Sequence, residues 1–216
     1  FQMNEVQRSK IILKILNKIY PKTSIPLKHR NKFTLLVSVL LSAQTTDVNV
    51  NNVTKNIYPK YYNPHHFKKL GRKKIEKLIK KIGIFRIKSK SIYNLSKILV
   101  KNFDGKVPKT YDELESLPGV GHKTASVVMS QGFGHAAFAV DAHIHRLAQR
   151  WGLTNGKNVV QTENDLKRIF PKKTWSKLHL QIIYYGREYC KARDCYGLTC
   201  KICTSCYPNR KQPVKT

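Results

Sequence analysis

Lys123 and Asp141 are the residues of this sequence whose types and positions point most directly to chemistry. Lys123 follows Gly119 and Gly121 at the expected start of a helix, and Asp141 lies eighteen residues further on. An uncharged lysine amine is a nucleophile, and a helix N-terminus with partial desolvation favours the uncharged form. On residue type alone, phosphate contact is the simpler role for Lys123, and capping of the following helix is the simpler role for Asp141.

A helix, a glycine-rich hairpin and a second helix must position Lys123. Residues 110–116 are predicted to form a short helix with a capping box at its start. Pro118 and Gly119 end that helix, and the second helix begins near Gly121. The unpaired N–H groups at the start of the second helix form an anion site beside Lys123.

The rest of the chain is predicted to be helical. Apolar residues recur at helical spacing, and no alternating strand pattern of useful length occurs. We expect a connector around Pro59 and Pro64 and a turn at residues 83–85. The further expected helices cover residues 6–20, 33–42, 47–58, 75–82, 89–103, 141–151, 163–170 and 173–190. The predicted fold class is all-α.

The charge of the chain indicates a polyanionic partner. Lys and Arg total 41 and Asp and Glu total 12, which gives a net charge of +29 over 216 residues. Nucleic acid is the simplest partner for so basic a chain. Many of the lysines are expected to lie on solvated helix faces. The sequence has no apolar run long enough for a membrane span and no secretory signal, which argues against membrane and secreted proteins.

All five cysteines lie near the end of the sequence, between Cys190 and Cys206. A disulfide framework normally spreads cysteines along a chain, so clustering favours a metal site in a reducing compartment. The pair at Cys200 and Cys203 has the C-x2-C spacing of tetrahedral zinc sites. Iron–sulfur clusters also take four thiolates.

Three stretches together resemble the endonuclease III family of helix-hairpin-helix DNA glycosylases. They are residues 117–125 with the sequence LPGVGHKTA, residues 140–143 with VDAH, and residues 40–47 with LLSAQTTD. The cysteines begin at Cys190, where the family carries its iron–sulfur loop. The resemblance spans nearly the whole chain.

The resemblance implies two helical lobes with a DNA-binding cleft between them. One lobe is a helical barrel over residues 25–132 that contains the helix-hairpin-helix motif. The other combines residues 1–24 with residues 133–216 and carries Asp141 and the C-terminal Fe–S loop.

The resemblance also implies roles for individual residues. Lys123 would attack C1′ of a damaged nucleotide, expel the base and form a Schiff base, after which β-elimination cleaves the strand on its 3′ side. Asp141 would stabilise the positive charge on the sugar or help to move protons.

Five residues are expected to contact DNA. In the family pattern Gln44 enters the duplex where the base is flipped out, and Ile84, which replaces a leucine, wedges the opposite strand. Ordinary core packing is the alternative role for Ile84. The backbone N–H groups of Gly119, Val120 and Gly121 would hold a phosphate.

The implied cofactor is a [4Fe–4S] cluster, with a structural zinc ion as the alternative. The family spacing is C-x6-C-x2-C-x5-C, and this chain departs from it. We expect Cys190, Cys200, Cys203 and Cys206 as ligands, with Cys195 as a substitute for Cys206.

These observations predict a bifunctional DNA N-glycosylase and abasic-site (AP) lyase of base excision repair that removes oxidised pyrimidines. The expected partner is double-stranded DNA with damaged bases or abasic sites, and we expect a monomer. The absence of a targeting signal indicates a bacterial-type, cytoplasmic, nucleoid-associated protein. The alternatives are an adenine-type monofunctional glycosylase and a non-catalytic basic nucleic-acid-binding protein with a zinc knuckle.

Overall fold

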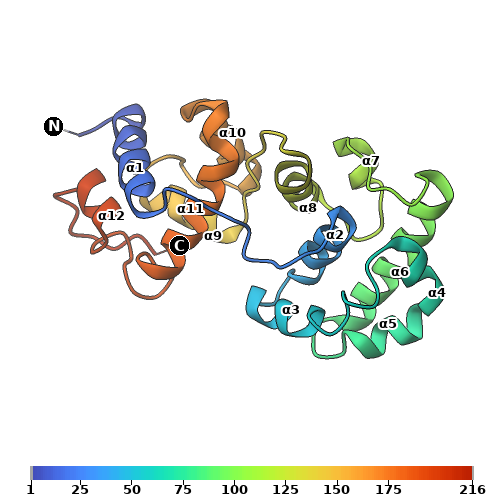
Figure 1. The fold of residues 1–216 in the computed structure, drawn as a ribbon. Coiled ribbons are helices and arrows are strands. Elements are labelled where there is room, and N and C mark those ends of the chain that lie inside the picture. Colours follow the sequence, from blue (N-terminus) through green and yellow to red (C-terminus); the bar gives the residue numbers. More distant parts are fainter. Residues whose placement is uncertain (1, 216) are drawn as a thin grey trace. The chain divides into compact units, whose positions relative to one another are not determined.

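The computed structural model describes residues 2–215 (Figure 1). All regular elements in this range are helical, and it contains no strand, so the predicted all-α class is confirmed. None of the helices in residues 2–215 combines the length and the apolar character that a membrane crossing requires.

The chain divides into two compact units. Unit 1 comprises Phe1–Ser24 and Ala136–Thr216, and unit 2 comprises Ile25–His135. The helices of unit 1 are α1 (Glu5–Ile19), α9 (Ala142–Arg150), α10 (Val159–Ile169), the 3₁₀ turn η2 (Lys172–Thr174), α11 (Trp175–Glu188) and α12 (Lys201–Cys206). Those of unit 2 are α2 (Lys32–Leu41), α3 (Asp47–Thr54), α4 (Pro64–Leu70), α5 (Arg72–Leu78), α6 (Phe85–Asn102), α7 (Tyr111–Glu115), α8 (His122–Val127) and the π-helical turn η1 (Val128–Gly132).

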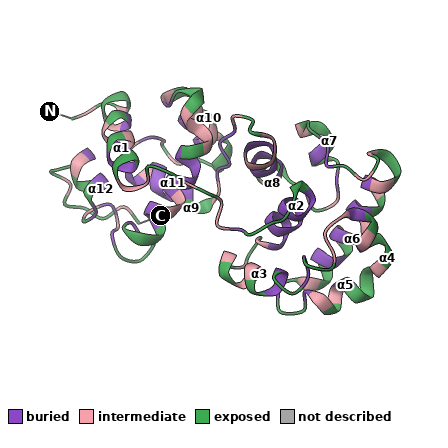
Figure 2. Ribbon diagram, in the orientation of Figure 1, coloured by how far each residue is buried: buried purple, intermediate pink, exposed green. Residues whose placement is uncertain are grey.

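Helix α2 forms the centre of unit 2. Every residue of α2 except Lys32 is buried, and the helix packs against α3, α6, α8 and η1. Figure 2 shows α2 largely in the colour of buried residues. Its start is fixed by Asn31, whose side-chain oxygen accepts a hydrogen bond from Thr34 N at 2.9 Å. A helix that is apolar all round belongs inside a core, so α2 provides a fixed base for the functional turns around it.

Unit 1 is built from both ends of the chain. Helix α1 packs against α10, α11 and α12, and α9 packs against α10 and α11. The core of this unit includes Leu16, Leu147 and Trp151, none of which is exposed, together with the buried cysteines. The cysteine loop is therefore part of a hydrophobic core.

Two helices were not predicted. Pro64 was expected to mark a connector, but it is the first residue of α4, which Asn63 caps through a bond from His66 N. Proline is well suited to the first helical position, because its missing N–H has no helical partner there. Helix α12 is only six residues long. Its cysteines were interpreted as metal ligands and not as part of a helix. Helix α3 also ends at Thr54, earlier than expected.

Candidate active site and metal centre

The hairpin between α7 and α8 has the expected form. Thr110 caps α7 by accepting a hydrogen bond from Glu113 N at 3.2 Å. Gly119 adopts φ +77°, and a Cβ at this position would lie 2.8 Å from Ser91 Cβ and 3.2 Å from Leu40 Cδ1. Glycine is required at position 119 for both reasons, since a side chain would meet α6 and α2.

The second glycine serves a different purpose. Gly121 is the N-cap residue of α8 and supplies no side-chain hydrogen bond to the helix. A Cβ on Gly121 would meet nothing within 4 Å, so its neighbourhood is open. Val120 between the glycines is buried, and its side chain packs inward. Only backbone groups of this segment are available to an anion.

Lys123 is exposed and lies in the first turn of α8. The expected partial desolvation is therefore not supplied by the fold around Lys123, and the approach of DNA would have to provide it. His122, the residue before it, bonds to Glu115 with 2.8 Å between Nδ1 and Oε1 and stacks on Tyr111. These contacts tie α8 to α7 and hold the first turn that carries the lysine.

Asp141 lies in unit 1, at the N-cap of α9. Its Oδ1 accepts a hydrogen bond from Ile144 N at 2.8 Å, so the helix-capping role is observed. The side chain is half-buried and lines a cavity of about 200 Å³ together with His143, Arg146 and Arg187. The carboxylate therefore shares this cavity with basic side chains.

Gln44 and Ile84 occupy neighbouring turns of unit 2. Both side chains are exposed and both backbones are left-handed, with φ 58° at Gln44 and φ 50° at Ile84. A Cβ on Gly83 would lie 3.6 Å from Gln44 O, so the two turns are adjacent. Ile84 is 46% exposed, which excludes core packing. A left-handed conformation is costly for a β-branched residue and is typical of functional turns.

The buried Lys88 holds these two turns in place, and the sequence analysis did not predict this role. Its side chain is only 3% exposed. Its Nζ donates hydrogen bonds to Leu41 O at 2.9 Å and Ala43 O at 2.5 Å. Burial lowers the pKa of the Lys88 ammonium. Because Lys88 lies in the first turn of α6, just after Ile84, it joins that turn to the chain that leads to Gln44.

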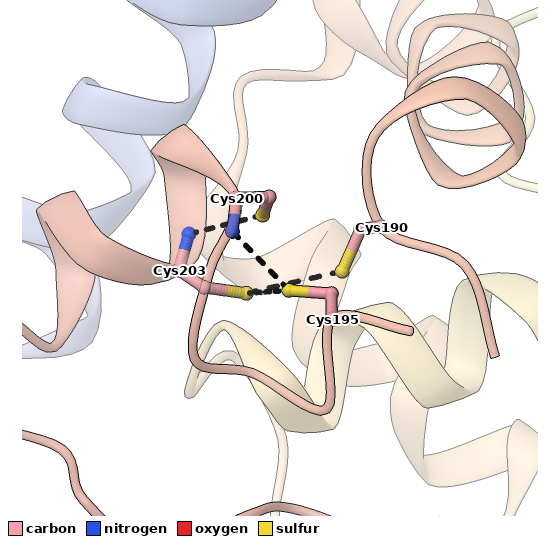
Figure 3. Close-up of side chains that lie close together, drawn as sticks. All are labelled: Cys190, Cys195, Cys200 and Cys203. Atoms are coloured by element: carbon pink, nitrogen blue, oxygen red, sulfur yellow. Dashed lines mark hydrogen bonds between the residues drawn. The ribbon is translucent and has the colours of Figure 1, made fainter. Parts of the chain in front are cut away.

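Four cysteine sulfurs gather in unit 1, as Figure 3 shows. Cys190 follows the end of α11, Cys195 lies in the loop, Cys200 caps α12 and Cys203 lies within α12. All four are buried, and their sulfurs lie within 4.8 Å of one another. Two backbone donors also face the group, with Cys200 N 3.3 Å from Cys195 Sγ and Cys203 N 3.4 Å from Cys200 Sγ. Four clustered thiols of this kind can bind a metal.

Comparison with known proteins gives the family. Residues 37–172 match the HhH-GPD superfamily of base excision DNA repair proteins. Endonuclease III of Bacillus subtilis (strain 168) is 38% identical over 214 residues, which cover 99% of this chain and 98% of that protein. Endonuclease III of Escherichia coli (strain K12) is 39% identical over 191 residues, covering 88% and 90%.

The chain belongs to the endonuclease III family. It is thus a base excision repair enzyme of the DNA glycosylase and AP lyase class. Two solved structures agree in fold, each 40% identical and covering 93% of this chain and 94% of the other. A trapped endonuclease III–DNA covalent intermediate gives a TM-score of 0.87, and a non-covalent endonuclease III–DNA complex gives 0.88.

Within this family fold, the expected Cys206 ligand stays a prediction. The sulfur group contains Cys195 and not Cys206. Cys203 and Cys206 are three residues apart on α12, which carries Cys206 about 4.5 Å further along the helix axis. Cys206 is buried beside Tyr207 and Arg210, and burial raises the pKa of its thiol to about 11.

Two buried arginines contact Cys190, one of the four clustered cysteines. Arg150 is fully buried, and its Nη1 lies 3.5 Å from Cys190 Sγ. The same guanidinium donates to Lys191 O at 2.8 Å and to Ala192 O at 2.9 Å. Arg146 Nη2 donates to Cys190 O at 3.2 Å. Buried cations are retained where they face negative charge, as a group of thiolates would provide.

Proposed function

We propose that this protein removes oxidised pyrimidines from double-stranded DNA and then cleaves the strand at the resulting abasic site. The observation that carries the proposal is the position of Lys123, exposed in the first turn of α8 directly behind the glycine hairpin. A relative that is 40% identical to this chain was captured as a covalent intermediate with DNA, which requires a protein nucleophile.

The reaction begins with the uncharged amine of Lys123. Its nitrogen forms a bond to C1′ of the damaged nucleotide, and the bond from C1′ to the base breaks, with the electron pair leaving on the base. Opening of the sugar ring gives a Schiff base between Lys123 and C1′. Loss of a proton from C2′ then expels the 3′ phosphate by β-elimination, and water releases the lysine.

Asp141 supports the positive charge that develops on the sugar. Its carboxylate already accepts one hydrogen bond from Ile144 N, and that bond orients the group. A carboxylate held in this way stabilises a cationic transition state electrostatically. The proposal requires the same DNA to engage Lys123 and Asp141.

DNA is held and opened by the turns of unit 2. The backbone N–H groups of Gly119, Val120 and Gly121 would bind one phosphate, in the open space around Gly121. Gln44 would fill the gap left by the flipped base, and Ile84 would wedge the opposite strand. The exposure of both side chains and their adjacent turns support this assignment. The enzyme would act as a monomer.

We also propose that four cysteines of the C-terminal loop bind a metal. The family resemblance favours a [4Fe–4S] cluster at this position, whereas the sulfur spacing favours a smaller centre. Neither metal takes part in the chemistry at Lys123, so the glycosylase and lyase proposal does not depend on which one is bound.

Borohydride trapping on a duplex with one thymine glycol tests the proposal. The wild-type protein should form a stable covalent adduct, because borohydride reduces the Schiff base. Lys123→Ala should bind the duplex but give no adduct. Lys101→Ala, which removes an exposed lysine at the end of α6, is the matched control and should be trapped normally. Undiminished trapping of Lys123→Ala would remove Lys123 from the mechanism.

The same assay separates the alternative functions. An adenine-type monofunctional enzyme would release adenine from a mispair and give no adduct. A non-catalytic binding protein would retain the duplex without changing it. Release of the oxidised base together with a trapped adduct is expected only from the proposed enzyme.

A further inference from the structure

The four clustered sulfurs lie unusually close together for the cofactor that the family resemblance implies. Cys203 Sγ is 3.8 Å from Cys190 Sγ and 3.7 Å from Cys195 Sγ. Every pair among Cys190, Cys195, Cys200 and Cys203 is within 4.8 Å (Figure 3). These distances restrict the size of any metal centre that the sulfurs can share.

The two candidate centres require different sulfur spacings. Zinc holds four thiolates in a tetrahedron at about 2.3 Å, which places any two sulfurs about 3.8 Å apart. A [4Fe–4S] cluster holds each thiolate on a different iron at a corner of the cluster, so the sulfurs stand roughly 6 Å apart. The observed distances fit a single tetrahedral ion and are too short for the cluster.

The cysteine positions support the same distinction. Counted from Cys190, the family spacing C-x6-C-x2-C-x5-C would place the other cysteines at positions 197, 200 and 206. Position 197 is a glycine with φ +82°, and a Cβ there would lie 2.6 Å from Arg210 Nη1. A cysteine at this position would be strained. Cys206 is present, but its sulfur lies outside the group.

We propose that Cys190, Cys195, Cys200 and Cys203 bind one zinc ion in a tetrahedral site that replaces the [4Fe–4S] cluster of the family. Four thiolates and one divalent ion carry a net charge of −2. The buried guanidinium of Arg150, 3.5 Å from Cys190 Sγ, offsets part of this charge.

The zinc site would be structural. Its ligands come from the end of α11, from the loop and from α12, so one ion would join three segments of unit 1. No open position is needed for substrate, because all four ligand sites on the ion are taken by thiolates. The inference stands apart from the chemistry proposed for Lys123, and its readouts involve no enzyme activity.

Metal analysis of the full-length protein is the first test. The protein would be purified without oxygen from cells supplied with iron and zinc and overproducing iron–sulfur assembly proteins. A family member with the C-x6-C-x2-C-x5-C spacing, prepared in parallel, shows that the cells load clusters. We expect about one zinc per chain and no broad visible absorption. A brown protein with about four irons and inorganic sulfide per chain would overturn the proposal.

Cobalt substitution identifies the ligands. The protein would be stripped of metal without oxygen and titrated with Co²⁺, which absorbs strongly in the visible when four thiolates surround it tetrahedrally. The wild type and Cys206→Ser should give the same spectrum with an endpoint at one cobalt per chain. Cys195→Ser should lose intensity and bind cobalt more weakly. The reverse result, loss in Cys206→Ser with an unchanged Cys195→Ser, would overturn the proposed ligand set.

Discussion

The turns of unit 2 that carry Gln44 and Ile84 differ from the cysteine loop of unit 1 in where their functional atoms lie. The two turns expose their side chains and adopt left-handed backbones, and a buried Lys88 beneath them provides the hydrogen bonds. The cysteine loop buries its sulfurs, and backbone N–H groups of the loop and of α12 point at them.

This contrast separates two ways of holding a functional group. An exposed side chain makes few contacts of its own. Its position therefore depends on buried neighbours, such as Lys88, that play no part in the chemistry. Buried ligands hold one another once a metal is bound. Substitutions beneath the turns should therefore affect activity and stability together, whereas substitutions in the loop should affect stability and metal content.

The largest effect is expected at Asp141, which lies in the same unit as the cysteine loop but is expected to act on DNA. Asp141→Asn keeps an oxygen that can cap α9, so folding should be nearly unchanged. Loss of the charge should slow base removal roughly hundredfold or more under single-turnover conditions. Equal single-turnover rates would leave Asp141 as a helix cap only and would place all of the chemistry in unit 2.

The next effect is expected at Lys88. Lys88→Met retains much of the buried stem but removes the donors to Leu41 O and Ala43 O. An unsatisfied buried carbonyl such as Leu41 O costs about 1–3 kcal/mol, so the free energy of unfolding in urea should fall by that amount. Base removal should also slow, because Gln44 is no longer held. Lys90→Met, an exposed neighbour on α6, is the control and should change neither quantity.

A smaller effect is expected at Ile84. Ile84→Gly removes the wedge and at the same time relieves a left-handed conformation that costs a branched residue about 1–2 kcal/mol. The unfolding free energy should stay level or rise, while base removal slows by about tenfold. The matched control is Ile87→Ala, because Ile87 is another exposed apolar residue of α6. A loss of stability without a loss of activity would contradict the assigned role.

The smallest expected effect is a pH dependence of the unfolding free energy that is due to Lys88. Burial lowers the pKa of Lys88 in the folded protein below its ordinary value of 10.5. Between the lowered pKa and 10.5, the unfolded chain binds more protons than the folded one, so stability rises with pH across that range. The difference in unfolding free energy between wild type and Lys88→Met should therefore grow as the pH rises. A constant difference would show that burial does not perturb Lys88.

The sequence was a good guide wherever local spacing determines structure. The hairpin required glycine at position 119, and the structure shows the positive φ and close packing that explain it. Asp141 was recognised as a helix cap from its residue type. Pro64 was misinterpreted because proline both ends helices and begins them, and only the Asn63 cap distinguishes the two cases.

The sequence pattern did not predict contacts between residues that are far apart in the chain. Lys88 interrupts the apolar face of α6 that continues through Ile92, Leu95 and Leu99, and a lysine on an apolar face is a signal that its amine has a buried partner. The spacing could not predict which sulfurs lie together, because that depends on how the loop folds against α12, and Cys195 and Cys206 are both buried. The catalytic roles of Lys123 and Asp141 remain predictions.

Unit 1 is built from both ends of the chain, and this has a consequence for synthesis on the ribosome. Unit 2 is continuous from Ile25 to His135 and can fold as soon as it emerges. Helix α1 is made before unit 2, whereas its partners α10, α11 and α12 are made after unit 2. Its apolar side, with Ile12 and Leu16, therefore waits without its native partners while more than a hundred residues are translated. We expect α1 to be the segment of the nascent chain most in need of a chaperone.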